Sequence, residues 1–206
     1  MARRHDPATF RGALRYRLDS ELPLDASAAP DLPLLLDTTV YIDRSRGKLP
    51  RTILARIAAA QHRIYHCGVV CAELAISLGL LTPDHPRTPT TSAAILAHLD
   101  HMAGHRGVAP SAAAWTEAAV VAGILARTQG LATDKGQLNE AQIFCQRGRG
   151  RELLLDALLY FTAIEHNFLL MSGNVCDLDI LLQVRPSPNV LLYRPAGWVS
   201  AAAHSS

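Results

Sequence analysis

Four acidic side chains stand next to, or inside, the most apolar segments of the chain. Carboxylates that converge from separate segments repel one another unless a cation joins them, and Mg²⁺ or Mn²⁺ prefers such oxygen ligands. An ion of this kind can lower the pKa of a bound water and stabilise a leaving oxygen, which is the chemistry of phosphodiester hydrolysis. The four residues are Asp37, Glu73, Asp156 and Asp177. The pattern predicts a metal-dependent hydrolase that needs no protein nucleophile.

A structural role also explains several of these residues one at a time. Asp37 follows the run LLL and could cap the helix that begins at Thr38 or Thr39. Glu73 could complement a helix dipole from a first turn. Asp177 could be a surface carboxylate, and its neighbour Asp179 is an equal candidate for the fourth acid. Taken separately, these residues leave cap and ligand as open alternatives.

Asp156 is harder to explain as an ordinary surface residue. It interrupts the segment LLLDALLYF, within a stretch that is apolar nearly all round. Burying an unpaired carboxylate costs several kcal/mol or shifts its pKa until the group is neutral. Arg149 and Arg151 precede it and offer an ion pair as the structural alternative. A shared cation is the functional one.

The elements that must position these acids alternate between short apolar runs and longer helical patterns. We expect strands at 34–36, 64–70, 167–172 and 189–193, and helices at 50–63, 70–80, 91–104, 111–129, 152–166 and 174–184. Strands that read as continuous apolar runs are covered on both faces, so an α/β fold with a central, mainly parallel sheet is predicted. Ligands bind such sheets beyond the carboxyl ends of the strands, which is where the acids stand.

Bulk composition limits the class of protein. The 206 residues suffice for one domain with a core and an appendage, and 49% apolar against 18% charged residues indicate a globular chain. The net charge of +2 indicates nothing about nucleic acid. No run is long enough to span a membrane, and the cysteine spacing fits neither a zinc ribbon nor a disulfide framework. A reduced, cytoplasmic setting is expected.

The motifs around these acids, in their order, resemble those of PIN-domain nucleases. LLLDTTVYID resembles the family's opening motif, VVCAELAISLG the second, and LLLDALLYFTAIEHNFLLMSGNVCDL the last block. Within the last block, Ser172 stands where the family has Thr, and Leu178 where it has Phe. Single-domain VapC-type ribonuclease toxins of type II toxin–antitoxin modules are the most similar group. The resemblance divides the chain into an N-terminal extension at 1–32, partly disordered, a PIN-like three-layer domain at 33–194, and a C-terminal tail at 195–206.

This resemblance implies a magnesium-dependent endoribonuclease in which Mn²⁺ is the alternative ion. Asp37, Glu73, Asp156 and Asp177 would be the catalytic and metal-binding acids. The supporting hydrogen-bonding residues would be Thr38, Thr39, Ser172 and Asn174. The basic run with Arg147, Arg149 and Arg151 would hold the RNA backbone, because cations supply much of the affinity for phosphates. The implied partners are RNA, a small antitoxin protein and a second copy in a homodimer. A non-catalytic PIN-like binding module and a nuclease for housekeeping RNA processing are the alternatives.

Overall fold

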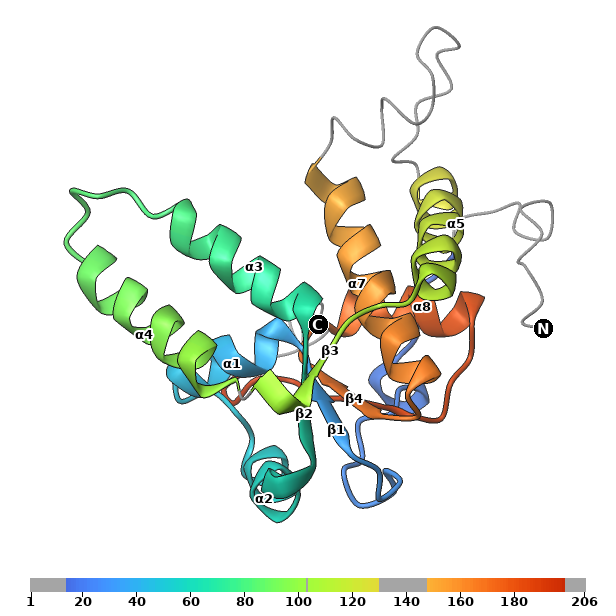
Figure 1. The fold of residues 1–206 in the computed structure, drawn as a ribbon. Helices are drawn as coiled ribbons and strands as arrows, with labels where there is room; N and C mark the ends of the chain where they lie inside the picture. The colour runs from blue at the N-terminus through green and yellow to red at the C-terminus, as the bar shows by residue number, and fades with distance from the viewer. Residues whose placement is uncertain (1–13, 103, 130–147, 199–206) are drawn as a thin grey trace, which may run out of the picture.

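The computed structural model describes residues 14–102, 104–129 and 148–198, and at positions 148 and 149 it describes the backbone only (Figure 1). The strands are β1 (Leu34–Leu36), β2 (Ile64–Cys67), β3 (Gly107–Val108), β4 (Leu169–Ser172) and β5 (Val190–Leu192). The helices are α1 (Thr38–Ser45), α2 (Arg51–Ala59), α3 (Gly68–Gly79), α4 (Thr88–His101), α5 (Ala112–Thr128), α7 (Gly148–Glu165) and α8 (Val175–Val184). Short 3-10 turns are η2 (Asp19–Glu21), η3 (Gln61–Arg63) and η4 (Gly104–Arg106).

The described strands form one five-stranded sheet in the order β3-β2-β1-β4-β5, and every pairing is parallel. The predicted α/β class with a parallel central sheet is therefore confirmed. Figure 1 shows α5, α7 and α8 grouped on one side of the molecule and α1 to α4 on the other. Helices on both sides explain why the central strands are continuous apolar runs, since β1, β4 and β5 are buried along their whole length.

The strand order changes direction at the centre of the sheet. From β1 the chain builds outward through β2 to β3, then returns to place β4 and β5 on the other side of β1. Loops that leave β1 and β4 therefore diverge to opposite faces, and the space between them is where ligands bind in open parallel sheets. Asp37 directly follows β1, and the segment 172–174 lies at the end of β4.

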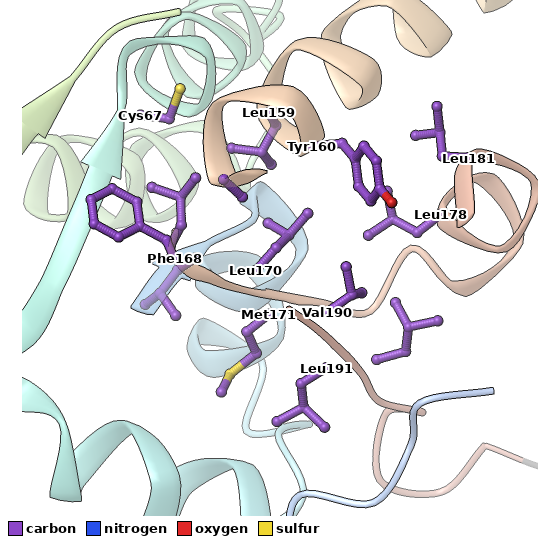
Figure 2. Packing of buried hydrophobic residues seen from close by; sticks show 14 of the residues in the cluster. Cys67, Leu159, Tyr160, Phe168, Leu170, Met171, Leu178, Leu181, Val190 and Leu191 are labelled. Atoms are coloured by element: carbon purple, nitrogen blue, oxygen red, sulfur yellow. The ribbon is translucent and has the colours of Figure 1, made fainter. Parts of the chain in front are cut away.

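The core is formed by the central strands and the helices packed on them. Figure 2 shows side chains of α7 and α8, including Tyr160, Leu178 and Leu181, gathered against those of β4 and β5. The residues that this cluster buries most completely include Leu34, Leu35, Leu158, Leu169 and Leu170, none of which has measurable exposure. Within the described ranges, no helix is both long enough and apolar enough to cross a lipid bilayer.

Several element boundaries differ from those predicted. The apolar run at 64–70 is a strand only to Cys67, because α3 begins at Gly68 and carries Val69 and Val70 into the core. The short strand β3 was not predicted, since two residues give no periodicity. At the other end of the domain, α7 begins at Gly148, inside a Gly and Arg segment that was expected to be a loop. Tertiary packing overrides weak local preference in each case.

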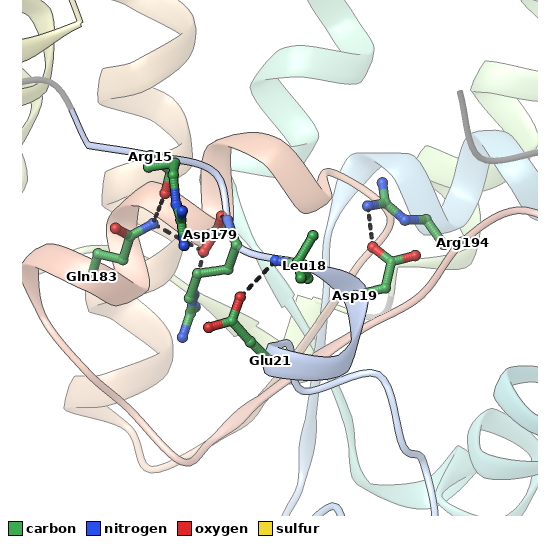
Figure 3. Close-up of polar contacts among 8 residues, drawn as sticks. Arg15, Leu18, Asp19, Glu21, Asp179, Gln183 and Arg194 are labelled. Carbon is green, nitrogen blue, oxygen red and sulfur yellow. Dashed lines mark hydrogen bonds and ion pairs between the residues drawn. The ribbon is translucent and has the colours of Figure 1, made fainter. Parts of the chain in front are cut away.

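Residues 14–32, expected to belong to an extension, lie against the domain. Leu22 is part of the buried core, and the Leu192 N–H donates to the Pro23 carbonyl at 2.8 Å, next to β5. Figure 3 shows the same segment held on α8, where the Arg17 N–H and Nε donate to Asp179 at 2.7 Å and 2.5 Å. The boundary at 32 stays a prediction, and residues 1–13 lie outside the described part of the chain.

The contact between Arg17 and Asp179 predicts a measurable loss of stability. R17A leaves the Asp179 side chain, which is 2% exposed, without its guanidinium partner. We expect the free energy of unfolding in urea to fall by about 1–3 kcal/mol, below the value for a fully buried pair because Arg17 is partly exposed. The control is R15A, since the exposed Arg15 binds Gln183 through its backbone carbonyl only. Equal stabilities of the two variants would contradict the prediction.

Candidate active site

A cleft with a volume of about 320 Å³ lies between α1, α3, α7 and the start of α8. Figure 1 shows the arrangement of α1, α3, α7 and α8, the helices at which the residues of this cleft lie. The predicted site residues that line it are Asp37, Thr38, Thr39, Glu73, Arg151, Asp156, Asn174 and Asp177. Residues separated by up to 140 positions in the chain thus share one cavity, as the predicted fold requires. Their roles stay predictions.

Asp37 is held in place by a dense set of hydrogen bonds. As the cap of α1, its Oδ1 accepts the Thr38 N–H at 2.6 Å. Its Oδ2 accepts the hydroxyls of Thr39 at 2.7 Å and Ser172 at 2.5 Å. Burial raises the pKa of this carboxyl, and the hydrogen bonds from Ser172, Thr39 and Thr38 act in the opposite direction. A backbone hydrogen bond from Thr39 also lowers the pKa, so donors from three residues hold the Asp37 carboxylate.

The cap of α1 is the role of Asp37 that the structure shows, and its role as a metal ligand stays a prediction. The Ser172 hydroxyl that reaches Oδ2 is itself fixed, because Ser172 Oγ accepts the Asn174 N–H at 2.9 Å. Ser172 has no exposure and lies beneath Asp37, outside the cleft wall.

Glu73 reaches the same site from α3. Thr38 Oγ1 donates a hydrogen bond to Glu73 Oε2, which joins the first turn of α1 to α3. Burial is the main cause that raises the pKa of Glu73, and the charge of Asp37 adds to it, whereas Thr38 and Arg151 lower it. Glu73 and Asp37 are thus bonded to adjacent threonines, and the charge of Asp37 raises the pKa of Glu73.

Asp156 is the acid most disturbed by its surroundings. It is partly exposed because it faces the cleft, yet the protein removes enough water to raise its pKa well above the usual range. The charges of Asp37, Asp177 and Glu73 raise it further, in that order, against a single hydrogen bond from Asn174 Nδ2 at 3.1 Å. The predicted alternative of an ion pair is not seen at Arg151, since no bond to Asp156 joins them among the described side chains.

The structure distinguishes Asp177 from Asp179. They lie two residues apart on α8, a spacing that turns side chains to opposite faces of a helix. Asp177 lines the cleft, and its charge contributes to the raised pKa of Asp156. Asp179 is 1% exposed and is bonded to Arg17 of the N-terminal segment. Asp177 is the acid that the fold places in the cleft.

Of the predicted basic run, only Arg151 can be placed. It lines the cleft next to Glu152, whereas Arg147 and the side chain of Arg149 lie outside what the structure describes. Sequence reasoning missed Glu152, and it missed the apolar rim formed by Ile42, Ile76, Leu80 and Leu155. Helical spacing could have found part of it, since positions 76 and 80 follow Glu73 by three and seven residues, on the same helix face.

The carboxylates of the cleft are suitable ligands for a divalent cation, but their positions in this conformation do not form a complete coordination site. Among the described residues, no three His, Cys, Asp or Glu side chains are grouped closely enough to hold a metal ion. The same four carboxylates share a cleft, and the charges of Asp37, Asp177 and Glu73 raise the pKa of Asp156 beyond the effect of burial. These two findings agree if the acids lie within electrostatic range but beyond a common coordination distance. A bound cation would have to draw them closer by side-chain rotation.

Comparison with known proteins gives limited guidance. No protein-family model matches the chain, and no curated protein matches it. Among solved structures, FitAcB from Neisseria gonorrhoeae is 15% identical with a TM-score of 0.46, and the match covers 78% of this chain and 96% of that one. VapBC2 from Rickettsia felis, bound to a promoter DNA fragment, is 16% identical with a TM-score of 0.43, covering 81% and 98%. Likenesses this weak carry no evidence about activity.

The raised pKa of Asp156 predicts that D156N stabilises the metal-free protein. The folded chain holds this proton to higher pH than the unfolded chain does. The stability that this bound proton contributes to the folded state is fully present below the pKa of the unfolded chain. It is lost as the pH rises through the raised pKa of the folded chain. We expect D156N to raise the Tm at pH 8 by about 2–4 °C, the effect of ~1 kcal/mol in a chain of this size, with a smaller gain at pH 5.

The matched control is E165Q, which neutralises an exposed carboxylate near the other end of the same helix. Scanning calorimetry in the presence of a chelator should show no pH-dependent gain for it. A D156N protein that is less stable than wild type at every pH would contradict the electrostatic reading of the cleft.

Proposed function

We propose that this chain is a divalent-metal-dependent endoribonuclease, with Mg²⁺ as the ion and Mn²⁺ as its substitute, that acts as the toxin of a type II toxin–antitoxin module. The observation that carries the nuclease part is the convergence of carboxylates from four separate helices or helix starts on one cleft. Burial raises the pKa of Asp156, and the charges of Asp37, Asp177 and Glu73 raise it further. Such an arrangement is unfavourable without a cation, and proteins retain it where the cation is used.

The residues of the cleft have distinct parts in this proposal. Asp37, Glu73, Asp156 and Asp177 would hold the cation. When bound, the ion supplies an activated water and positive charge at a scissile phosphodiester. Thr39 and Ser172 keep Asp37 in one rotamer, so that its carboxylate has a fixed orientation. Asn174 does the same for Asp156.

Residues at the edge of the cleft would contact the RNA substrate. Arg151 lies where a phosphate of the RNA backbone could meet it, and its charge also lowers the pKa of Glu73. The exposed Ile76 and Leu80 on α3 form an apolar wall on the opposite side. A single strand of RNA bound along the cleft would contact the cation through its phosphates and the apolar wall through its bases.

The toxin assignment rests on the resemblance of the sequence motifs to VapC-type proteins. It implies a small antitoxin as partner and a homodimer as the assembled state. A housekeeping PIN nuclease would share the chemistry but lack the antitoxin. An adjacent small reading frame whose product abolishes growth arrest on co-expression would support the toxin, and growth unaffected by the active chain would contradict it.

A second candidate function is a non-catalytic binding module of the same fold. It is favoured by one observation, that the described acids do not form a coordination shell as they stand. For such a module, neutralising an acid would change stability and nothing else.

Cleavage assays separate these functions. Wild-type protein should cleave single-stranded RNA with Mg²⁺ or Mn²⁺ and stop when a chelator is added. D156N and E73Q should lose at least 100-fold in rate, because each removes a charge that would hold the ion. The measurement is the initial rate on an end-labelled RNA, with growth after induction as the cellular readout.

The control is again E165Q, whose carboxylate is exposed and remote from the cleft, and which should cleave at the wild-type rate. Full activity of both D156N and E73Q would show that the cleft is not the active site. Metal-independent cleavage would rule out the proposed chemistry.

A further inference from the structure

The loop that fixes Asp37 is itself held from behind by Tyr193, which lies outside the three motifs, and by Asp43, the last residue of the opening motif. Besides the Ser172 hydroxyl, the Gly173 N–H donates to Thr39 Oγ1 at 2.9 Å. The segment 172–174 therefore determines where Thr39 and Asp37 stand. What positions this segment decides the geometry of the cleft floor.

Tyr193 lies against the segment on the side away from the cleft. Its backbone N–H donates to the Ser172 carbonyl at 3.0 Å, continuing the pairing of β5 with β4 by one residue. Its ring covers Gly173 so closely that a Cβ added there would lie 3.0 Å from Tyr193 Cζ and Oη. A side chain at position 173 would require the ring or the loop to shift by a few tenths of an ångström, so the tyrosine ring limits how far the loop can move in that direction.

Asp43 fixes the tyrosine in turn. Its Oδ2 accepts the Tyr193 hydroxyl at 2.9 Å, in a contact where the two residues are 8% and 3% exposed. Burial raises the pKa of the Tyr193 phenol, and the hydrogen bond and charge of Asp43 raise it further, so the hydroxyl remains a donor at neutral pH. The carboxylate is thereby paired with a donor that does not titrate under physiological conditions.

These contacts close a ring. Asp43 and Thr39 are four residues apart on α1 and face the same way. From Asp43 the chain of contacts runs through Tyr193, Gly173 and the Thr39 hydroxyl back to α1. A closed ring of hydrogen bonds and close packing restrains each member more than an open chain would, because no member can move without breaking another contact.

We propose that Tyr193 and Asp43 are positioning residues of the cleft: together they clamp segment 172–174 against α1 and so set the orientation of Asp37 for a divalent cation. This inference rests on the proposed function, because it names what holds one ligand of the proposed site. The clamp touches neither the cation nor the RNA. Its effect should therefore be on metal affinity, through the direction of the Asp37 carboxylate.

The test compares two tyrosine-to-phenylalanine variants, Y193F and Y160F. Tyr160 is a matched control because it is also buried, and its hydroxyl also donates a hydrogen bond, to the Arg185 carbonyl, away from segment 172–174. Both variants should lose a similar amount of stability. Y193F should weaken the binding of Mn²⁺ alone, followed by its electron paramagnetic resonance signal, by about tenfold, the lower end of the effect of an outer-shell partner. Y160F should bind Mn²⁺ as wild type does.

Two further variants make the result specific. D43N keeps a carbonyl oxygen to accept the Tyr193 hydroxyl and should retain Mn²⁺ affinity within about twofold, whereas D43L should behave like Y193F. G173A should also weaken Mn²⁺ binding, because its methyl group would meet the ring at 3.0 Å and displace the segment.

The outcomes separate this inference from the function on which it rests. Wild-type Mn²⁺ affinity in Y193F and D43L, with normal RNA cleavage, would overturn the clamp and leave the nuclease intact. An equal loss of affinity in Y193F and Y160F would assign the effect to stability and would also overturn it. A wild-type protein that binds no Mn²⁺ and cleaves no RNA would overturn both proposals.

Discussion

Electrostatic repulsion between carboxylates in a poorly hydrated cleft is the constraint around which the rest of the site is arranged. Asp156 experiences the charges of Asp37, Asp177 and Glu73, and loss of water makes each charge harder to screen. Free in water, these carboxylates would move apart, but the folded chain holds each of them on a different element of the α/β framework. The parallel sheet brings those elements together because β1 and β4 are adjacent strands whose following segments diverge. The fold therefore keeps the acidic side chains close enough to repel one another, and a bound proton or cation reduces that repulsion.

Hydroxyl groups, rather than cations, organise the acids in the described structure. Thr38 binds Glu73, while Thr39 and Ser172 bind Asp37. Neutral donors hold a carboxylate in one rotamer without cancelling its charge, so the negative potential of the cleft is preserved for a ligand. The two threonines follow Asp37 directly, and one turn of α1 therefore orients acids from both β1 and α3. The clamp of Tyr193 and Asp43 extends this arrangement to the end of β5, where its hydrogen bond is shielded from water.

The two acids of helix α8, Asp177 and Asp179, have different surroundings. Asp177 faces the cleft, whereas Asp179 is bonded to Arg17 and so attaches the N-terminal segment to the domain. A spacing of two residues on a helix makes this division unavoidable, because the side chains point about 200° apart. The N-terminal segment in turn continues alongside β5, the strand that carries Tyr193 at its end. Attachment of residues 14–24 and positioning of segment 172–174 thus depend on the same edge of the sheet.

The sequence by itself determined the α/β class, the order of most elements and three of the acids that line the cleft, Asp37, Glu73 and Asp156. A continuous apolar run such as 34–36 is typical of a strand covered on both faces, and a carboxylate inside LLLDALLYF requires a partner. Only the tertiary structure decided between Asp177 and Asp179, because the choice depends on which helix face meets the N-terminal segment. It also decided the roles of Asp43 and Tyr193, 150 positions apart, and the two-residue strand β3. Pairing between distant residues leaves no periodic trace in a sequence, whereas burial of a whole strand or helix face does.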